Sequence, residues 1–337
     1  MRRRGITVLL GALITALLSI GVLAAPIPYV VLGPGPTVDT LGADDGKQVI
    51  QVSGQETSAS AGQLRLTTVG VQPNVKLLSA IAGWLSDDEA VVPRELIYPP
   101  GQTQQQVDER NAEDFAASQT SAETAALIKL GYPVQVVVKT VTPDGPSVGV
   151  LQPDDIITSV DGQPVTFGRK LTSLVQAKPA GSALSIGYTR AGTPGTATVT
   201  SREQDGKPRI GVAIEQRQPH PFDLKIDLDH IGGPSAGLMF ALGIVDKLTP
   251  EDLTGGKIIA GTGTINEEGK VGPIGGIPQK LVGAKLAGAK VFLVPADNCA
   301  EALRNPQPDL PLLKVDTLDD ALTALETLRA GGQPTRC

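Results

Sequence analysis

The pattern of apolar and polar positions begins with one long apolar segment. Residues 5–25 contain no charged side chain, and Arg2, Arg3 and Arg4 stand directly before them. Because about 20 helical residues cross the ~30 Å hydrocarbon layer of a bilayer, the pattern predicts a membrane anchor over residues 1–26. Basic residues before the helix and an acidic chain after it favour an extracytoplasmic location for the remainder. A cleaved signal peptide ending near Ala24 is the alternative.

The middle of the chain alternates between strand-like and helix-like patterns. Residues 48–52 and 63–71 alternate or are β-branched, which predicts strands. Residues 76–85 predict a short amphipathic helix with Trp84 as a core anchor. Residues 103–130 lack Gly and Pro and are rich in Gln, Glu and Ala, which predicts a long helix.

The second half continues with shorter elements. Residues 134–141, 184–189, 196–200, 222–228 and 290–294 are predicted strands, and residues 168–176 are a predicted helix. Two further helices are expected to start where glycines are followed by Pro234 and by Pro278. Helices and strands are thus mixed along the chain, which indicates an α/β or α+β fold.

Composition narrows the class of function. The chain has 29 basic and 35 acidic residues. Without Arg2–Arg4 its formal net charge is 26 − 35 = −9, which argues against a phosphate-binding surface. Ten aromatic residues in 337 argue against base-stacking platforms. Two cysteines cannot build a Cys-rich zinc site, and no metal or cofactor is expected. Outside the cytoplasm Cys299 and Cys337 could pair; a buried Cys299 with a free Cys337 is the alternative.

The candidate chemistry centres on Ser235, within the segment Gly233-Pro234-Ser235-Ala236-Gly237. A helix start leaves backbone N–H groups unpaired, and such groups stabilise developing negative charge. We therefore expect an oxyanion hole formed by Gly233, Pro234, Ser235 and Ala236. A serine cap on an ordinary helix is the simpler alternative.

The same segment matches the G-x-S-x-G pattern of Ser-His-Asp hydrolases, whose histidine follows the serine in α/β-hydrolases. Here His220 and His230 both precede Ser235, so that arrangement fails. Lysine is the known alternative base. Lys280 falls in the first turn of a predicted helix, where both the helix dipole and burial favour the neutral amine.

Residues 118–203 resemble a PDZ domain. The resemblance rests on the run from Gly149 through Asp155 and Ile156 to Val160-Asp161-Gly162-Gln163-Pro164-Val165, with Asp154 where the family usually has Gly. PDZ domains bind extended peptide ends by adding a strand to a sheet edge. The resemblance implies a peptide-binding loop that contains Gly131, Tyr132, Pro133 and Val134; a structural spacer that binds nothing is the alternative.

The segments around Ser235 and Lys280 resemble the Lon-type protease domain, whose motifs read G-P-S-A-G and P-I-G-G-(L/I)-x-x-K. The resemblance implies that Ser235 is the nucleophile, Lys280 the general base and Thr262 a supporting hydroxyl. Gly232 departs from the pattern, because many Lon sequences carry Asp there. Together with the N-terminal anchor, the chain resembles a bacterial family of membrane-anchored PDZ–Lon-like proteases.

That resemblance implies a domain plan and a set of partners. A Lon-like domain over residues 204–337 would be completed by residues 27–117, with the PDZ domain of residues 118–203 inserted between them. The chain has no G-x-x-x-x-G-K-[ST] segment, so no nucleotide is expected. Expected partners are protein or peptide substrates and membrane lipid, with a homo-oligomer as one option.

The sequence therefore predicts an ATP-independent serine endopeptidase that acts outside the cytoplasmic membrane. Two alternatives stay open. One is a membrane-tethered PDZ scaffold with a degenerate protease domain, and the other is an esterase that depends on His230.

Overall fold

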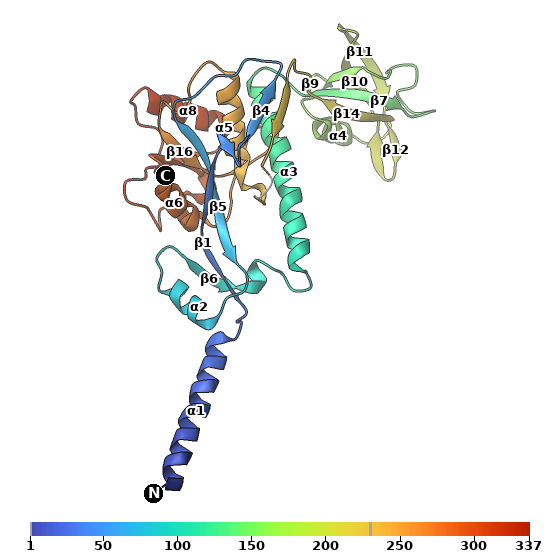
Figure 1. The fold of residues 1–337 in the computed structure, drawn as a ribbon. Helices are drawn as coiled ribbons and strands as arrows, with labels where there is room; N and C mark the ends of the chain where they lie inside the picture. Colours follow the sequence, from blue (N-terminus) through green and yellow to red (C-terminus); the bar gives the residue numbers. More distant parts are fainter. Residues whose placement is uncertain (1, 229–230) are drawn as a thin grey trace. The chain divides into compact units, whose positions relative to one another are not determined.

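The computed structural model describes residues 2–228 and 231–337, which form two compact units (Figure 1). The first unit is discontinuous and combines residues 1–126 with residues 222–337. The second unit is continuous and comprises residues 127–221.

The first unit begins with helix α1 (Arg2–Ala24). Its stretch Ile6–Leu23 has a mean hydropathy of 2.5 and no buried residue. The predicted apolar helix is therefore present, and its length and composition suit either a membrane span or a signal sequence.

A six-stranded mixed sheet forms the centre of the first unit, in the order β20-β19-β16-β5-β1-β6. Its strands are β1 (Tyr29–Asp39), β5 (Gln63–Gln72), β6 (Ala90–Pro93), β16 (Ile258–Gly261), β19 (Val291–Pro295) and β20 (Leu312–Val315). The strands β5, β16, β19 and β20 run parallel, whereas β1 is antiparallel to β5 and β6. Strands from before and after the second unit thus share one sheet.

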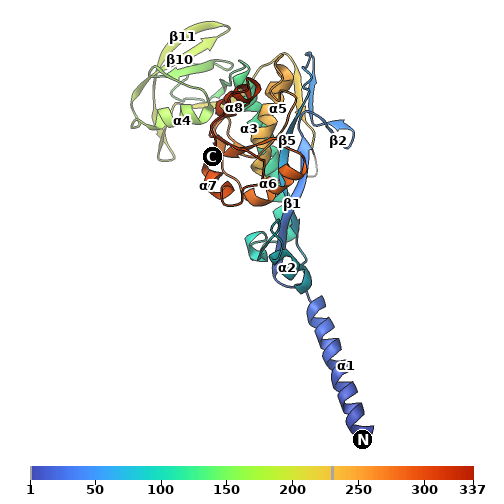
Figure 2. The same ribbon diagram turned by 90° about the vertical axis from the view of Figure 1, so that its left-hand side faces the viewer.

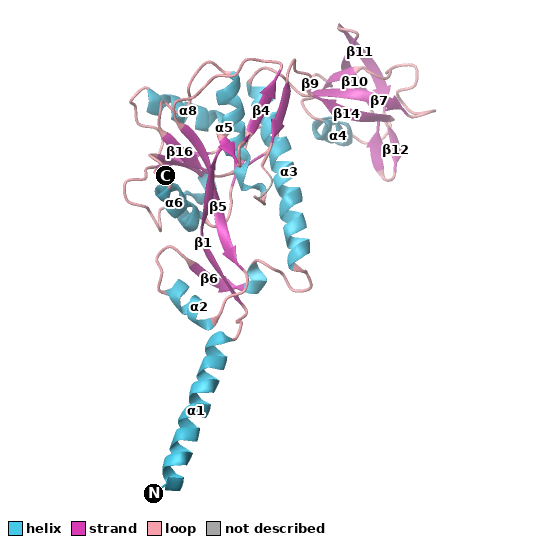
Figure 3. Ribbon diagram, in the orientation of Figure 1, coloured by secondary structure: helices cyan, strands magenta, loops and turns pink. Residues whose placement is uncertain are grey.

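Helices cover both faces of the parallel part of this sheet (Figure 3). They are α5 (Gly237–Leu248), α6 (Ile277–Leu286), α7 (Cys299–Ala302) and α8 (Leu318–Arg329). On one face, Ile277 and Leu281 of α6 cluster with Phe292. On the other face, a Cβ at Gly261 would lie 2.7 Å from Met239 Sδ of α5, so only glycine allows this approach.

The remaining elements of the first unit are short or lie beside the sheet. The small sheets pair β2 (Ala43–Asp44) with β3 (Lys47–Gln48), β4 (Ile50–Ser53) with β15 (Asp223–Ile226), and β17 (Thr264–Ile265) with β18 (Val271–Gly272). The helices are α2 (Leu77–Trp84), the long α3 (Gln104–Lys129), and the 3₁₀ turns η1 (Arg94–Leu96), η2 (Pro234–Ala236) and η3 (Ala296–Asn298).

The second unit is a small sheet packed on one helix. Its strand order is β11-β10-β8-β7-β14, with β9 paired to β8. The elements are β7 (Gln135–Val141), β8 (Ile156–Val160), β9 (Gln163–Pro164), α4 (Gly168–Gln176), β10 (Ala183–Arg190), β11 (Thr193–Thr200), β14 (Val212–Arg217) and the hairpin β12 (Arg202–Gln204)–β13 (Lys207–Arg209). Asp155 is fully buried and accepts two hydrogen bonds from Arg190, at 2.7 and 2.8 Å. The ion pair gives hydrogen-bond partners to the acidic residue that the sequence pattern singled out. Burial raises the pKa of Asp155, but the hydrogen bonds from Arg190 counteract it, and the pKa lies below its usual value.

The mixed α/β fold class is confirmed, but three local predictions differ from the structure. Trp84 is 57% exposed and is no core anchor, because α2 turns Ala80 and Gly83 inward instead. The strand predicted over residues 48–52 is interrupted at Val49. Several strands were not predicted, among them β1, β6 and β14, although in β14 the apolar Val212 and Ile214 are two residues apart, a spacing that favours a strand.

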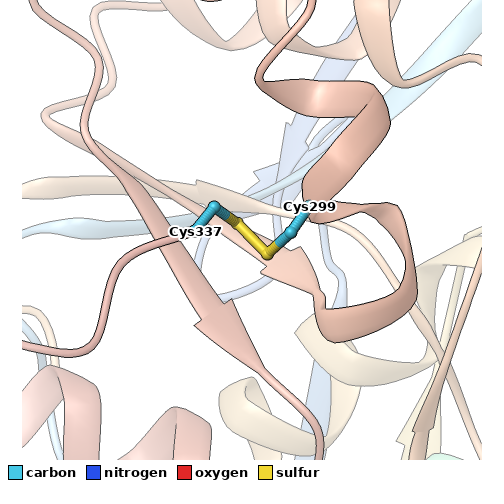
Figure 4. Close-up of a disulfide and its surroundings, with 2 residues drawn as sticks. All are labelled: Cys299 and Cys337. Atoms are coloured by element: carbon cyan, nitrogen blue, oxygen red, sulfur yellow. A yellow bond between two sulfur atoms is a disulfide. The ribbon is translucent and has the colours of Figure 1, made fainter.

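Cys299 and Cys337, left open by the sequence, form a disulfide (Figure 4). The bond ties the end of the chain to α7, 38 residues earlier. The tail also pairs with β20, where the Cys337 amide donates to Leu312 O at 3.1 Å. The disulfide and this hydrogen bond together hold the C-terminus against α7 and β20.

Candidate active site

Ser235 lies where the chain enters a buried helix. Gly233 has a φ of +85°, a conformation that favours glycine, and Pro234 stands at the first helical position. The 3₁₀ turn η2 then runs into α5, whose residues Gly237–Asp246 are all buried. The rigid helix fixes the backbone of Ser235, and the side chain remains partly accessible.

Lys280 reaches Ser235 from the first turn of α6. The helix starts after Gly276, which adopts the left-handed conformation with a φ of +71°. Lys280 is only 3% exposed, and its Nζ lies 2.7 Å from Ser235 Oγ. The Ser235 hydroxyl and the Lys280 amine are therefore within hydrogen-bond reach, as a nucleophile and its base must be.

Thr262 orients the amine. Its Oγ1 donates to the backbone oxygen of Ser235 at 3.1 Å and accepts from Lys280 Nζ at 2.9 Å. Because the hydroxyl has a single hydrogen and that hydrogen is used, Lys280 must be the donor in the second bond. A neutral amine held in this way can direct its lone pair at Ser235 Oγ.

Burial sets the protonation state of Lys280. It lowers the pKa of the amine from 10.5 to about 7, and desolvation is the cause. A large fraction of the lysine is therefore neutral at neutral pH, which is the form a general base needs.

Helix α3 holds the nucleophile segment from the other side. Ser118 Oγ donates to Pro234 O at 2.9 Å, and the Gly233 amide donates to Asn111 O at 2.7 Å. A Cβ at Gly232 would lie 2.9 Å from Asn111 Cβ, so glycine at this position lets α3 approach closely. Asn111 and Ser118 could not be singled out from the sequence, because they are polar residues in a helix without a clear apolar face.

Ser235 and Lys280 open into a cavity of about 470 Å³. The cavity is lined by residues of β1, β5, α3 and the loops around the dyad, among them Pro36, Val69, Asn111, Thr264, Ile274 and Gly275. Asn298 fixes one wall, since its side-chain amide makes two 2.9 Å hydrogen bonds to the backbone of Ile274. The dyad thus faces a preformed cavity lined by the central sheet, α3 and the dyad loops.

The four residues predicted for the oxyanion hole differ in what they can donate. Pro234 has no amide hydrogen, and the amide of Gly233 already donates to Asn111 O. Ser235 and Ala236 stand at the helix start, where the first amides have no acceptor within the helix. Their two N–H groups are the better candidates.

The predicted peptide-binding residues Gly131, Tyr132, Pro133 and Val134 connect α3 to β7. They do not line the cavity of the second unit, which has a volume of about 430 Å³. That cavity lies between α4 and the edge strand β14, and its walls include Leu171, Thr172 and Val175 of α4 and Gly211 to Ile214.

The two histidines of the chain lie in different segments. His220 belongs to the second unit, where its Nδ1 lies 2.8 Å from Gln218 O. His230 lies outside the described residues. Within residues 2–228 and 231–337, no cluster of three or more His, Cys, Asp or Glu could hold a metal ion.

Comparison with known proteins assigns a domain to each of two segments. Residues 105–200 match the model of the PDZ domain, and residues 230–327 match that of the Lon protease (S16) C-terminal proteolytic domain. The second segment contains Ser235, Thr262 and Lys280 together.

Relatives named as Lon proteases agree with the second assignment. Lon protease 1 of Sorangium cellulosum is 41% identical over 126 residues, 36% of this chain and 15% of the relative. The Lon protease of Campylobacter concisus is 40% identical over 94 residues, 27% of this chain and 11% of the relative. The chain thus matches only a small part of the length of these relatives. The PDZ domain of the SdrC-like protein from Listeria monocytogenes is 26% identical, covers 23% of this chain and 85% of that structure, and gives a TM-score of 0.23.

Proposed function

We propose that this chain, which combines a PDZ domain with a Lon-type proteolytic domain and an N-terminal apolar helix, is a serine endopeptidase with a Ser235–Lys280 dyad. One observation carries the proposal. The buried Nζ of Lys280 lies 2.7 Å from Ser235 Oγ, in surroundings that lower its pKa to about 7.

The reaction follows from this geometry. Neutral Lys280 takes the proton of Ser235 Oγ as the oxygen attacks the substrate carbonyl. The amides of Ser235 and Ala236 stabilise the resulting oxyanion. The protonated lysine then gives its proton to the leaving amine, and a water molecule activated by the neutral lysine hydrolyses the acyl-enzyme.

We place this reaction outside the cytoplasm, at the membrane surface. Helix α1 would act as a single-span anchor, and three arginines before it favour a cytoplasmic N-terminus. The Cys299–Cys337 disulfide supports the assignment, because disulfides persist in oxidising compartments.

The PDZ domain would bind substrate peptides in the groove between α4 and β14. Strand β14 is an edge strand, so an extended peptide could add to it while side chains enter the cavity beside α4. This groove replaces the loop of Gly131 to Val134 as our proposed binding site.

Cleavage of an unfolded protein by the full chain in detergent tests the proposal. Ser235→Ala and Lys280→Ala should each lower the rate by a factor on the order of 10³ or more, because each removes one half of the dyad. ATP should change nothing, since the proposal assigns no step to a nucleotide. Undiminished cleavage by Ser235→Ala would overturn the proposal, and a folded wild-type chain without any cleavage would favour the scaffold alternative.

A further inference from the structure

Helix α2 is apolar on the face that it turns to solvent. Its buried face consists of Ala80 and Gly83, which pack against the β1–β6 end of the sheet (Figure 1). Leu78, Ile81, Ala82 and Leu85 follow the helical spacing i, i+3, i+4 and i+7, and we call them the α2 outer face. Leu78, Ile81 and Leu85 are 57%, 40% and 83% exposed. An apolar stripe of this kind marks a surface that another apolar phase covers.

The α2 outer face begins beside the end of α1. The amide of Ile27, three residues after α1, donates to Val75 O at 3.0 Å, and Pro26 pairs with Lys76 in a β-bridge. Paired residues lie about 5 Å apart, so the start of α2 is held close to the point where the chain leaves the apolar helix. Figure 2 again shows α2 beside the lower end of β1. Because α2 has eight residues, it is about 12 Å long.

Aromatic side chains accompany this surface. Trp84 is 57% exposed and makes an edge-to-face contact with Tyr29 at a centroid distance of 6.0 Å. Tryptophan and tyrosine are enriched at membrane–water interfaces, where one side of the ring is apolar and the other is wet. The acidic residues that follow, Asp87 and Asp88, are exposed and would stay on the aqueous side.

We propose that the α2 outer face and Trp84 insert into the interfacial layer of a lipid bilayer. The inference deepens the proposed function and rests on its assignment of α1 as a membrane anchor. Continuity with α1 selects lipid as the occupant over a protein partner. The contact is apolar insertion rather than attraction to anionic lipid, because Asp87 and Asp88 adjoin it. It would give the first unit a second attachment point and so restrict its tilt at the membrane.

The single tryptophan makes the inference testable, because all tryptophan emission reports on Trp84. The full chain is reconstituted in phosphatidylcholine vesicles whose acyl chains carry bromine near the headgroup. We expect blue-shifted emission, strong quenching by the brominated lipid and protection from aqueous iodide. Emission that iodide quenches freely and brominated lipid does not would overturn the inference. Shielding from iodide without quenching by brominated lipid would indicate a protein partner and would overturn it as well.

Two double variants control the experiment. In the first, Leu78→Gln is combined with Ile81→Gln. It should lower the ratio of chains whose Trp84 contacts lipid to chains whose Trp84 is exposed to water by roughly tenfold or more. Leu286→Gln with Leu303→Gln changes leucines of 76% and 54% exposure elsewhere in the unit and should leave the ratio unchanged. Equal effects of the two pairs would contradict a specific contact.

The same samples distinguish a failure of this inference from a failure of the proposed function. Protease activity is measured on the same samples, so loss of lipid contact with retained cleavage rejects only the inference. Mass spectrometry of the purified chain shows whether α1 is retained. If α1 has been removed, the inference loses its premise and is rejected, whatever the protease activity of the chain.

Discussion

Lys280 is a residue that the fold holds at a cost in stability. The Lys280 side chain is 3% exposed, and burial lowers the pKa of its amine to about 7. The amine therefore keeps its proton only below that pH. The difference between the ordinary pKa of 10.5 and the pKa of about 7 in the fold corresponds to about 5 kcal/mol. This free energy favours the unfolded chain, because the exposed lysine binds a proton more tightly than the buried one. In the proposed dyad, function therefore opposes stability.

Replacing Lys280 by Met should stabilise the fold while it abolishes cleavage. We expect a gain of about 2–4 kcal/mol at pH 7, less than the full amount because the bonds to Ser235 and Thr262 are lost. Since the unfolded lysine loses its proton near pH 10.5, the gain should shrink as the pH rises from 7 toward that value. Denaturant unfolding of wild type and Lys280→Met at several pH values measures this. A gain that does not depend on pH would contradict a buried neutral lysine.

At the scale of elements, α3 positions the nucleophile segment. Ser118 and Asn111 contact the backbone on the two sides of the Gly233–Pro234 bond. A Cβ at Gly237 would lie 2.8 Å from Ser118 Oγ, so the helix and the segment are packed without spare room. The long helix thus sets where Ser235 stands relative to Lys280.

Ser118→Ala should impair catalysis more than stability. The change leaves Pro234 O without its donor, which costs about 1–3 kcal/mol, and frees the segment to shift. We expect kcat to fall roughly tenfold or more while KM changes little, because the substrate cavity stays intact. Thr120→Ala is the matched control, since its exposed hydroxyl bonds only to Ala116 O of the same helix. An equal loss of kcat in the control, or a loss explained by unfolding alone, would refute the positioning role.

That Ser235 and Lys280 lie together could be predicted from the sequence, whereas the residues around them could not, for a physical reason. Ser235 and Lys280 each stand in a short contiguous motif at a helix start, and local chain chemistry specifies such starts. Ser118 reaches Pro234 across 116 residues, a contact that only tertiary packing creates. Trp84 was misplaced because an apolar helical spacing does not say whether the stripe faces a protein core or another apolar phase.

At the scale of the whole molecule, the unit of residues 127–221, most of which matches the PDZ model, is inserted into the unit that contains the match to the Lon-type proteolytic domain. The strands before the insertion complete the sheet beside β16, so the first unit forms only when both chain segments have been made. The groove was also hard to predict, because β14 begins 212 − 168 = 44 residues after the start of α4 and pairs with β7 in the sheet rather than with a sequence neighbour.

Filling the groove should weaken substrate delivery without touching the dyad. Thr172 is exposed and lines the cavity beside β14, so Thr172→Arg should block peptide binding. We expect at least about tenfold weaker binding of C-terminal peptides selected from a library, with unchanged cleavage of a short peptide that needs no delivery. Ser173→Arg, at an exposed neighbouring position that does not line the cavity, is the control. Peptide affinity that survives in Thr172→Arg would place the binding site elsewhere.

The pH dependence of kcat/KM tests the Ser235–Lys280 assignment most directly when it is measured without histidines. Because the neutral form of Lys280 is the base, kcat/KM should rise about tenfold per pH unit below pH 7 and level off above it. A chain with both His220→Gln and His230→Gln keeps Lys280 and should show the same rise with the same midpoint. Loss of activity in that variant, or of the rise near pH 7, would contradict a lysine base and favour a histidine in its place.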